Sequence, residues 1–147
     1  MLGGYRTPTQ EVGVDLDVNW LAVLVATVAH QALGGLWYGV VFRDTWLRAM
    51  GKTQEDIQTE SPGGGMAFGA VASLASVIAL AVILTYPEDP AVADGVAAGA
   101  VSGVGFVAAS TFMNGFYEQK PPVLTALFGA YYTLGLVAAG AILGAWQ

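Results

Sequence analysis

Four stretches of this chain carry no aspartate, glutamate, lysine or arginine, and each is long enough to cross a lipid bilayer. They run from Val18 to Phe42, from Gly63 to Pro87, from Gly95 to Tyr117 and from Val123 to Gln147. A membrane-spanning helix needs about 20 mostly apolar residues. Since the chain has only 147 residues, the sequence predicts an all-α integral membrane bundle of four transmembrane helices.

The predicted bundle is one domain over residues 18–147, and a polar N-terminal tail at residues 1–17 precedes it. Only 11% of the residues are charged, against about a quarter in a typical soluble domain. The spans are expected at about residues 18–41, 66–85, 92–116 and 123–146.

The connection after the first span has a helical pattern of its own. Apolar side chains recur there every three or four residues, at Phe42, Trp46, Leu47 and Met50. This pattern predicts a short helix that lies on the membrane surface. Thr53, followed three residues later by Asp56, predicts a capped second turn. The sequence SPGGG at residues 61–65 is expected to break any helix before the second span.

The positive charges predict the orientation, because lysine and arginine favour the cytoplasmic side. Arg43, Arg48 and Lys52 lie in the first connection and Lys120 lies in the third, whereas the N-terminal tail has Arg6 alone. The first and third connections are therefore expected in the cytoplasm. A multi-pass protein of the cell membrane with both termini outside follows from this assignment.

Polar side chains are expected to form a layer near the middle of the bilayer. His30, the only histidine, lies about 12 residues from the cytoplasmic end of the first span, hence about 18 Å deep. Counting about 12 residues from the cytoplasmic end of each other span also reaches polar side chains. The predicted midplane layer therefore consists of His30, Gln31, Ser76, Ser102, Tyr131 and Tyr132. A tyrosine hydroxyl is the expected partner of the imidazole.

Two interpretations of His30 remain open at this point. The structural one is a neutral imidazole that hydrogen-bonds one helix to another. The functional one is a proton or ion path, because ionisable groups inside membranes often mark such routes. Gln31 points about 100° away around the helix, so we expect the two side chains to have different partners. One of those partners could belong to a second helix of the bundle, and the other to a neighbouring subunit or a polar backbone site.

Glycines at a spacing of four residues predict close contacts between helices. Gly95, Gly99 and Gly103 form a double GxxxG ridge on the third span, and Gly140 and Gly144 repeat the spacing on the fourth. Small residues at this spacing let two backbones approach closely. The sequence leaves open whether the contact lies within or between chains, and chance in a glycine-rich chain is the alternative.

A rim of charged side chains is expected at the cytoplasmic surface. It consists of Arg43, Asp44, Glu118 and Lys120. Ion pairs Arg43–Glu118 and Asp44–Lys120 would join the first connection to the third, and exposed pairs of this kind contribute little stability. The rim could also receive a partner protein or a lipid headgroup.

The sequence offers no recognisable chemistry for an enzyme. The single histidine and the absence of cysteine predict no metal site and no cofactor, because zinc needs at least three protein ligands. The four serines within the spans have one histidine to share and no carboxylate at that depth, so no catalytic residue is expected. The net charge of −6 disfavours nucleic acid as a partner, since phosphate binding needs a basic surface.

Several short motifs carry a family resemblance. They are Asn19-Trp20, Gly35-Leu36-Trp37-Tyr38, Trp46 with Gly51, Phe116-Tyr117-Glu118 and Gly140-Ala141-Ile142-Leu143. Over roughly residues 18–146 the chain resembles the small bacterial and archaeal membrane proteins of domain of unknown function 1761. The resemblance implies four spans and no assigned activity, and it supplies no catalytic residues.

The sequence thus predicts a small structural or accessory membrane protein. The expected partners are the lipid bilayer, further copies of the chain joined through the glycine-rich helix faces, and a larger membrane complex. The alternative is a transporter or channel subunit for protons, ions or small solutes, with the midplane layer around His30 as its path.

Overall fold

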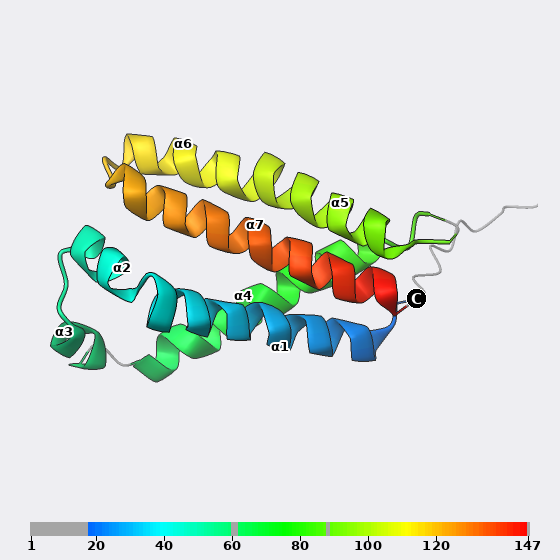
Figure 1. Cartoon of the computed structure of the whole chain (residues 1–147), viewed down its shortest axis with the longest axis horizontal. Helices are drawn as coiled ribbons and strands as arrows, with labels where there is room; N and C mark the ends of the chain where they lie inside the picture. The colour runs from blue at the N-terminus through cyan, green and yellow to red at the C-terminus, as the bar shows by residue number, and fades with distance from the viewer. Residues whose placement is uncertain (1–17, 60–61, 88, 147) are drawn as a thin grey trace, which may run out of the picture.

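The computed structural model describes residues 18–59, 62–87 and 89–146, and its described residues form helices and connecting turns without any strand. Figure 1 shows the arrangement. The helices are α1 (Trp20–Leu36), η1 (Trp37–Val41), α2 (Arg43–Met50), α3 (Gln54–Thr59), α4 (Pro62–Ile83), α5 (Val92–Ser102), η2 (Gly103–Ala108), α6 (Ala109–Tyr117) and α7 (Pro122–Ala145).

Four helical segments are long and apolar enough to span a membrane, which confirms the predicted all-α bundle. They are Trp20–Val41, Gly65–Ile83, Val92–Tyr117 and Pro122–Ala145. Two of them contain a π-helical turn, η1 at the end of the first and η2 in the middle of the third. The predicted polar tail, residues 1–17, lies outside the described residues.

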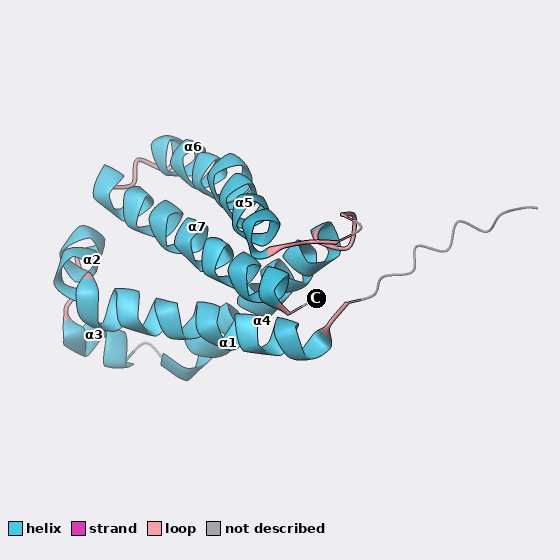
Figure 2. Cartoon of the chain, turned by 45° about the vertical axis from the view of Figure 1, so that its right-hand side comes forward, coloured by secondary structure: helices cyan, strands magenta, loops and turns pink. Residues whose placement is uncertain are grey.

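Helix α7 is the centre of the bundle. It packs against α1, α4 and the whole third span, and it has the largest buried share of the four spans. In both views α5 and α6 run beside α7, whereas α4 crosses α1 and α7 obliquely (Figures 1 and 2). The core cluster between α1, α4 and α7 consists of Ala22, Val23, Ala26, Val77, Leu80, Ala81, Leu84, Leu136, Ala139 and Leu143.

Asn19 ties the beginning of the first span to the end of the last. Its side-chain oxygen accepts a hydrogen bond from the backbone N–H of Ala22, so it caps α1. Its amide nitrogen donates to the backbone oxygen of Trp146 over 2.8 Å. One short polar side chain thereby satisfies an open helix start and an open helix end.

The connection after the first span contains the two predicted short helices. Helix α2 ends at Met50, and Gly51 after it has a positive φ of 64°, as is common for a glycine that follows a helix. The predicted cap of the second turn is confirmed, because the Asp56 carboxylate accepts from both the N–H and the hydroxyl of Thr53 at 2.7 Å. The predicted break at residues 61–65 is wrong for most of its length. Helix α4 begins at Pro62, since proline fits a first helical turn.

Candidate functional site

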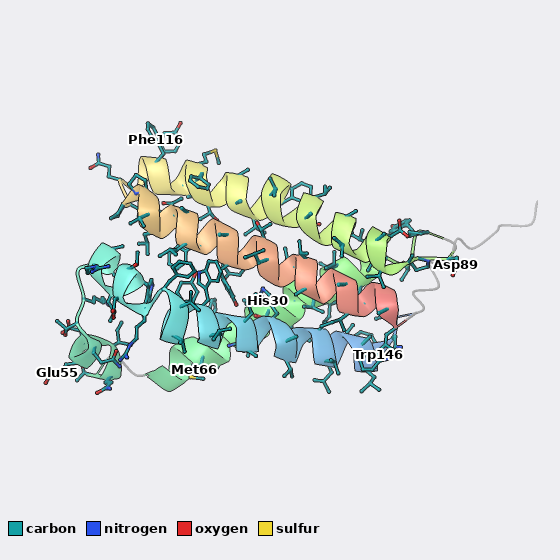
Figure 3. All side chains as sticks on the ribbon, viewed as in Figure 1. His30, Glu55, Met66, Asp89, Phe116 and Trp146 are labelled. Carbon is teal, nitrogen blue, oxygen red and sulfur yellow. The ribbon has the colours of Figure 1, made fainter. Side chains whose placement is uncertain are left out.

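The polar side chains near the middle of the bundle converge on Ser73 of α4. His30 is fully buried, and its Nδ1 lies 2.9 Å from the Ser73 hydroxyl oxygen. The same hydroxyl donates to the Gln31 side-chain oxygen over 3.1 Å. Gln31 in turn donates to the backbone oxygen of Met66 over 3.4 Å. The three side chains form a chain of hydrogen bonds between α1 and α4, and Figure 3 shows His30 in the middle of the molecule.

Two expectations about this layer are wrong. The imidazole does not pair with a tyrosine hydroxyl, because the Tyr131 hydroxyl donates instead to the His30 backbone oxygen over 3.4 Å. His30 and Gln31 also share one partner. Although they leave α1 in different directions, α4 crosses α1 beside them, and the flexible glutamine side chain reaches the serine that the imidazole already contacts.

The hydrogen-bond chain fixes the protonation pattern of neutral His30. The Ser73 hydroxyl has one proton and donates it to Gln31, so it accepts the hydrogen bond from His30. The Nδ1 atom therefore carries the proton, and the lone pair is on Nε2. This Nε2 is buried and has no hydrogen-bond partner in the described part of the chain. Such an atom is uncommon, because buried polar groups are almost always hydrogen-bonded.

Two glycines, neither of them among the predicted site residues, make room for this cluster. A Cβ atom at Gly135 of α7 would overlap Cδ2 and Nε2 of His30. A Cβ at Gly34 of α1 would lie 2.8 Å from the Tyr131 hydroxyl. The spacing offered a signal for the first of them. Tyr131 and Gly135 are four residues apart and therefore lie on the same face of α7.

Aromatic rings continue the cluster from His30 towards the first connection. The His30 ring stacks on Tyr131 with a centroid distance of 5.2 Å. Tyr131 contacts Tyr38 of η1 at 5.3 Å, and Tyr38 contacts Trp46 of α2 at 5.6 Å. Tyr132 also lies beside the imidazole, at 6.0 Å. The Tyr38 hydroxyl and the Trp46 indole nitrogen are buried without a hydrogen-bond partner among the described residues.

The remaining two members of the predicted layer stand apart from this cluster. The Ser76 hydroxyl donates to the backbone oxygen of Ala72 in its own helix over 3.0 Å. Ser102 lies at the end of α5, on the element that packs against α7. The structure therefore groups His30, Gln31, Tyr131 and Tyr132 with Ser73, and leaves Ser76 and Ser102 outside.

The glycine ridge makes its contact within the chain. A Cβ at Gly95 would overlap the backbone oxygen of Gly140, and a Cβ at Gly99 would overlap that of Leu136. Gly103 faces Thr133, and Gly144 faces the backbone oxygen of Ala91 at 2.6 Å from an added Cβ. The three ridge glycines and the two glycines of the fourth span, Gly140 and Gly144, are all buried where α5 and the start of η2 pack on α7. They are therefore not free to join two copies of the chain.

The charged rim pairs differently from the prediction. Lys120 forms an ion pair with Glu118 in the same turn, and the Arg43 guanidinium donates to the Gln54 side chain over 2.9 Å. Asp44 lies in the first turn of α2. The predicted ion pairs between the two connections are wrong, because Arg43 and Lys120 each have a partner in their own connection.

One of the comparisons with known proteins found a match, and it is to a family model. No group of three or more histidine, aspartate or glutamate side chains that could hold a metal ion occurs in the described ranges. No curated protein and no solved structure matches the chain. The family model described as protein of unknown function (DUF1761) matches residues 21–144. That match covers most of the chain, including all residues of the His30 cluster, and the protein thus belongs to the DUF1761 family of proteins of unknown function.

Proposed function

We propose that this chain is an accessory membrane protein that supports an assembly in the bilayer and has no enzymatic activity. The observation that carries the proposal is the hydrogen-bond chain of His30, Ser73 and Gln31. It uses the polar groups of the membrane interior to hold α1 against α4, which is the role of polar side chains between membrane helices.

Self-association is part of this proposal, and its surface is the outward face of the first span. Gly35 and Gly39 are four residues apart, and an added Cβ at either would meet nothing within 4 Å. Leu36 and Val40 beside them are exposed. An open pair of glycines with apolar neighbours suits the close approach of a second helix. The proposed partners are a second copy of the chain, the surrounding lipid and a larger membrane complex.

The experiment compares the native chain with one glycine variant and a matched control variant. Gly39→Leu blocks the proposed face, whereas Gly105→Leu places the same side chain at another glycine that has open space around it. Energy transfer between labelled copies in vesicles measures association. The proposal expects that Gly39→Leu lowers the apparent affinity between copies, obtained from the energy transfer, at least about tenfold. Gly105→Leu should leave this affinity unchanged. Equal transfer in all three proteins would refute the interface.

A second candidate function, proton transfer, is supported by one observation, the buried and unpartnered Nε2 of His30. A lone pair on an imidazole nitrogen can take up a proton. Proton flux into vesicles that contain His30→Ala or Ser76→Ala tests this function. Flux that is present in the native chain and in Ser76→Ala but absent in His30→Ala would favour proton transfer over the accessory role.

A further inference from the structure

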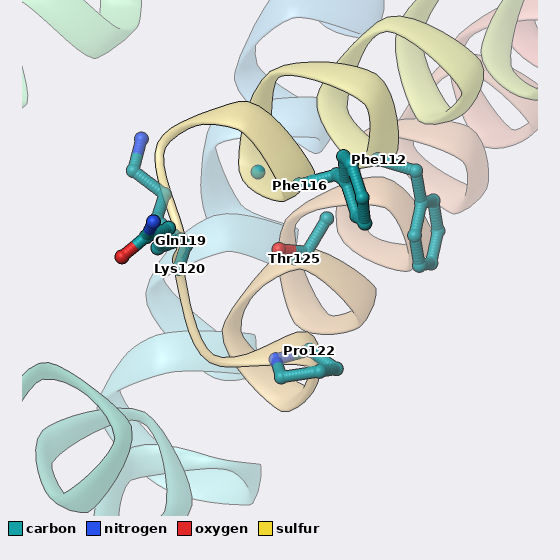
Figure 4. Close-up of a pocket in the computed structure, with 7 residues that line it drawn as sticks. Phe112, Phe116, Gln119, Lys120, Pro122 and Thr125 are labelled. Atoms are coloured by element: carbon teal, nitrogen blue, oxygen red, sulfur yellow. The ribbon is translucent and has the colours of Figure 1, made fainter.

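A hollow of about 340 Å³ opens where the third span turns into the fourth. The rings of Phe112 and Phe116 line it from α6, and Pro122 and Thr125 line it from α7 (Figure 4). Gln119 and Lys120 stand on the connecting turn (Figure 4). Small-molecule sites have volumes of about 300–1,000 Å³, so this hollow lies at the small end of that range.

The position of the hollow indicates that a lipid occupies it. The third span ends at Tyr117 and the fourth begins at Pro122, so the hollow lies where hydrocarbon gives way to headgroups. Phe116 is 81% exposed, and its ring faces the lipid side of the bundle. An apolar floor below a polar turn matches the glycerol and upper acyl chain of a phospholipid, with the headgroup above.

The charges on the turn form a pair of opposite signs. Glu118 and Lys120 bind each other, yet both side chains are about half exposed, so each has further capacity for hydrogen bonds. The beginning of α7, where the helix dipole is positive, adjoins Lys120, and the end of α6, where it is negative, adjoins Glu118. The turn therefore presents a positive side and a negative side next to one another.

We propose that this hollow binds a zwitterionic phospholipid with a primary ammonium group, that is, a phosphatidylethanolamine. Its phosphate accepts from Lys120 and from the Gln119 amide, and its ammonium donates to the Glu118 carboxylate. A choline headgroup has the same charges but no N–H to donate. A glycerol headgroup leaves the lipid with a net negative charge and places no cation beside Glu118.

Native mass spectrometry of the delipidated protein measures the binding of three lipids with identical acyl chains. The proposal expects tighter binding of phosphatidylethanolamine than of phosphatidylcholine or phosphatidylglycerol. Lys120→Gln is expected to weaken it about threefold to fivefold, the size of one partly exposed charge interaction. Phe116→Ala is expected to weaken all three lipids, because it removes part of the apolar wall. Glu118→Gln is expected to abolish the preference for the ethanolamine headgroup over the choline headgroup.

Two variants serve as matched controls. Arg48→Gln removes a cation from the first connection, and Phe106→Ala removes an exposed phenylalanine of η2, both outside the hollow. Each should leave the three affinities within about twofold, which is below 0.5 kcal/mol. The proposal is overturned if phosphatidylglycerol binds the native chain as tightly as phosphatidylethanolamine. It is equally overturned if Lys120→Gln and Phe116→Ala have no larger effect than the two controls.

Discussion

Gly135 has a steric role that a single methyl group can test. A Cβ at this position would overlap the His30 ring, and overpacking of this kind costs about 1–3 kcal/mol. We expect Gly135→Ala to lower the free energy of unfolding by this amount, measured by detergent titration. Gly105→Ala, where nothing lies within 4 Å, is the matched control and should not destabilise the protein.

A double-mutant cycle shows whether overlap with the His30 imidazole causes the loss of stability in Gly135→Ala. If the methyl group harms the protein through its overlap with the ring, Gly135→Ala should cost far less in a chain that already carries His30→Ala. The two changes would then be strongly non-additive. Additive effects would mean that the methyl group disturbs α7 by another route.

Ser73 and Ser76 provide a second comparison at the scale of one side chain. Ser73 joins His30 to Gln31, whereas Ser76 bonds only to its own helix. We expect Ser73→Ala to lower the free energy of unfolding by about 1 kcal/mol, because it leaves the buried Nδ1 of His30 and the partly buried side-chain oxygen of Gln31 without this partner. Ser76→Ala should have almost no effect. Equal losses in the two variants would contradict a specific role of Ser73 in joining α1 to α4.

The contact between α5 and α7 depends on the absence of side chains where the two backbones meet. An added Cβ at Gly95 would overlap a backbone oxygen of α7, and a backbone cannot move aside as a flexible side chain can. Gly95→Ala should therefore reduce the free energy of unfolding by about 3 kcal/mol, the upper end of the usual cost of overpacking. Gly105→Ala, on the same span but facing open space, should retain the native unfolding midpoint. A stable Gly95→Ala protein would show that the two helices can separate at little cost.

Helix α3 should respond to acid. The N–H and hydroxyl of Thr53 hold the pKa of Asp56 below its ordinary value of 3.8. Because the pKa is lower in the folded turn than in the unfolded one, the stabilisation is complete above about 3.8 and is lost as the pH falls through the lowered pKa. Amide exchange in α3 should therefore accelerate below this pH. The acceleration should vanish in Asp56→Asn and remain in Glu55→Gln.

The sequence predicted the elements that a lipid environment requires. The four spans follow from the lengths of the segments without charged residues, and the close contact at Gly95, Gly99 and Gly103 follows from their spacing of four residues. The partner of His30 does not follow from depth, because Ser73 and Ser76 lie one helical turn apart on α4, and only the crossing of α4 over α1 selects Ser73. The π-helical turns η1 and η2 were also missed, because a shifted backbone hydrogen bond leaves the hydropathy pattern unchanged.

At the scale of the whole molecule, the first and third connections lie at one end of the bundle. Asn19 and Trp146 meet at the other end through a hydrogen bond. Figure 1 shows α2, α3 and the α6–α7 turn together, opposite the beginning of α1 and the end of α7. Whichever side of the membrane holds α2 therefore also holds the lipid hollow. The orientation of the chain decides which leaflet supplies that lipid.

The absence of cysteine allows this orientation to be measured with single introduced thiols. Gln58 on α3 and Tyr86 after α4 are both exposed and lie at opposite ends of the bundle. Arginine and lysine favour the cytoplasm for the end that contains α3. A membrane-impermeant maleimide added to intact cells should therefore label Tyr86→Cys, and it should label Gln58→Cys only after permeabilisation. The reverse pattern would invert the topology and assign the lipid hollow to the outer leaflet. Labelling of both cysteines in intact cells would indicate that the chain inserts in both orientations. In that case the few positive charges would not be enough to fix a single topology.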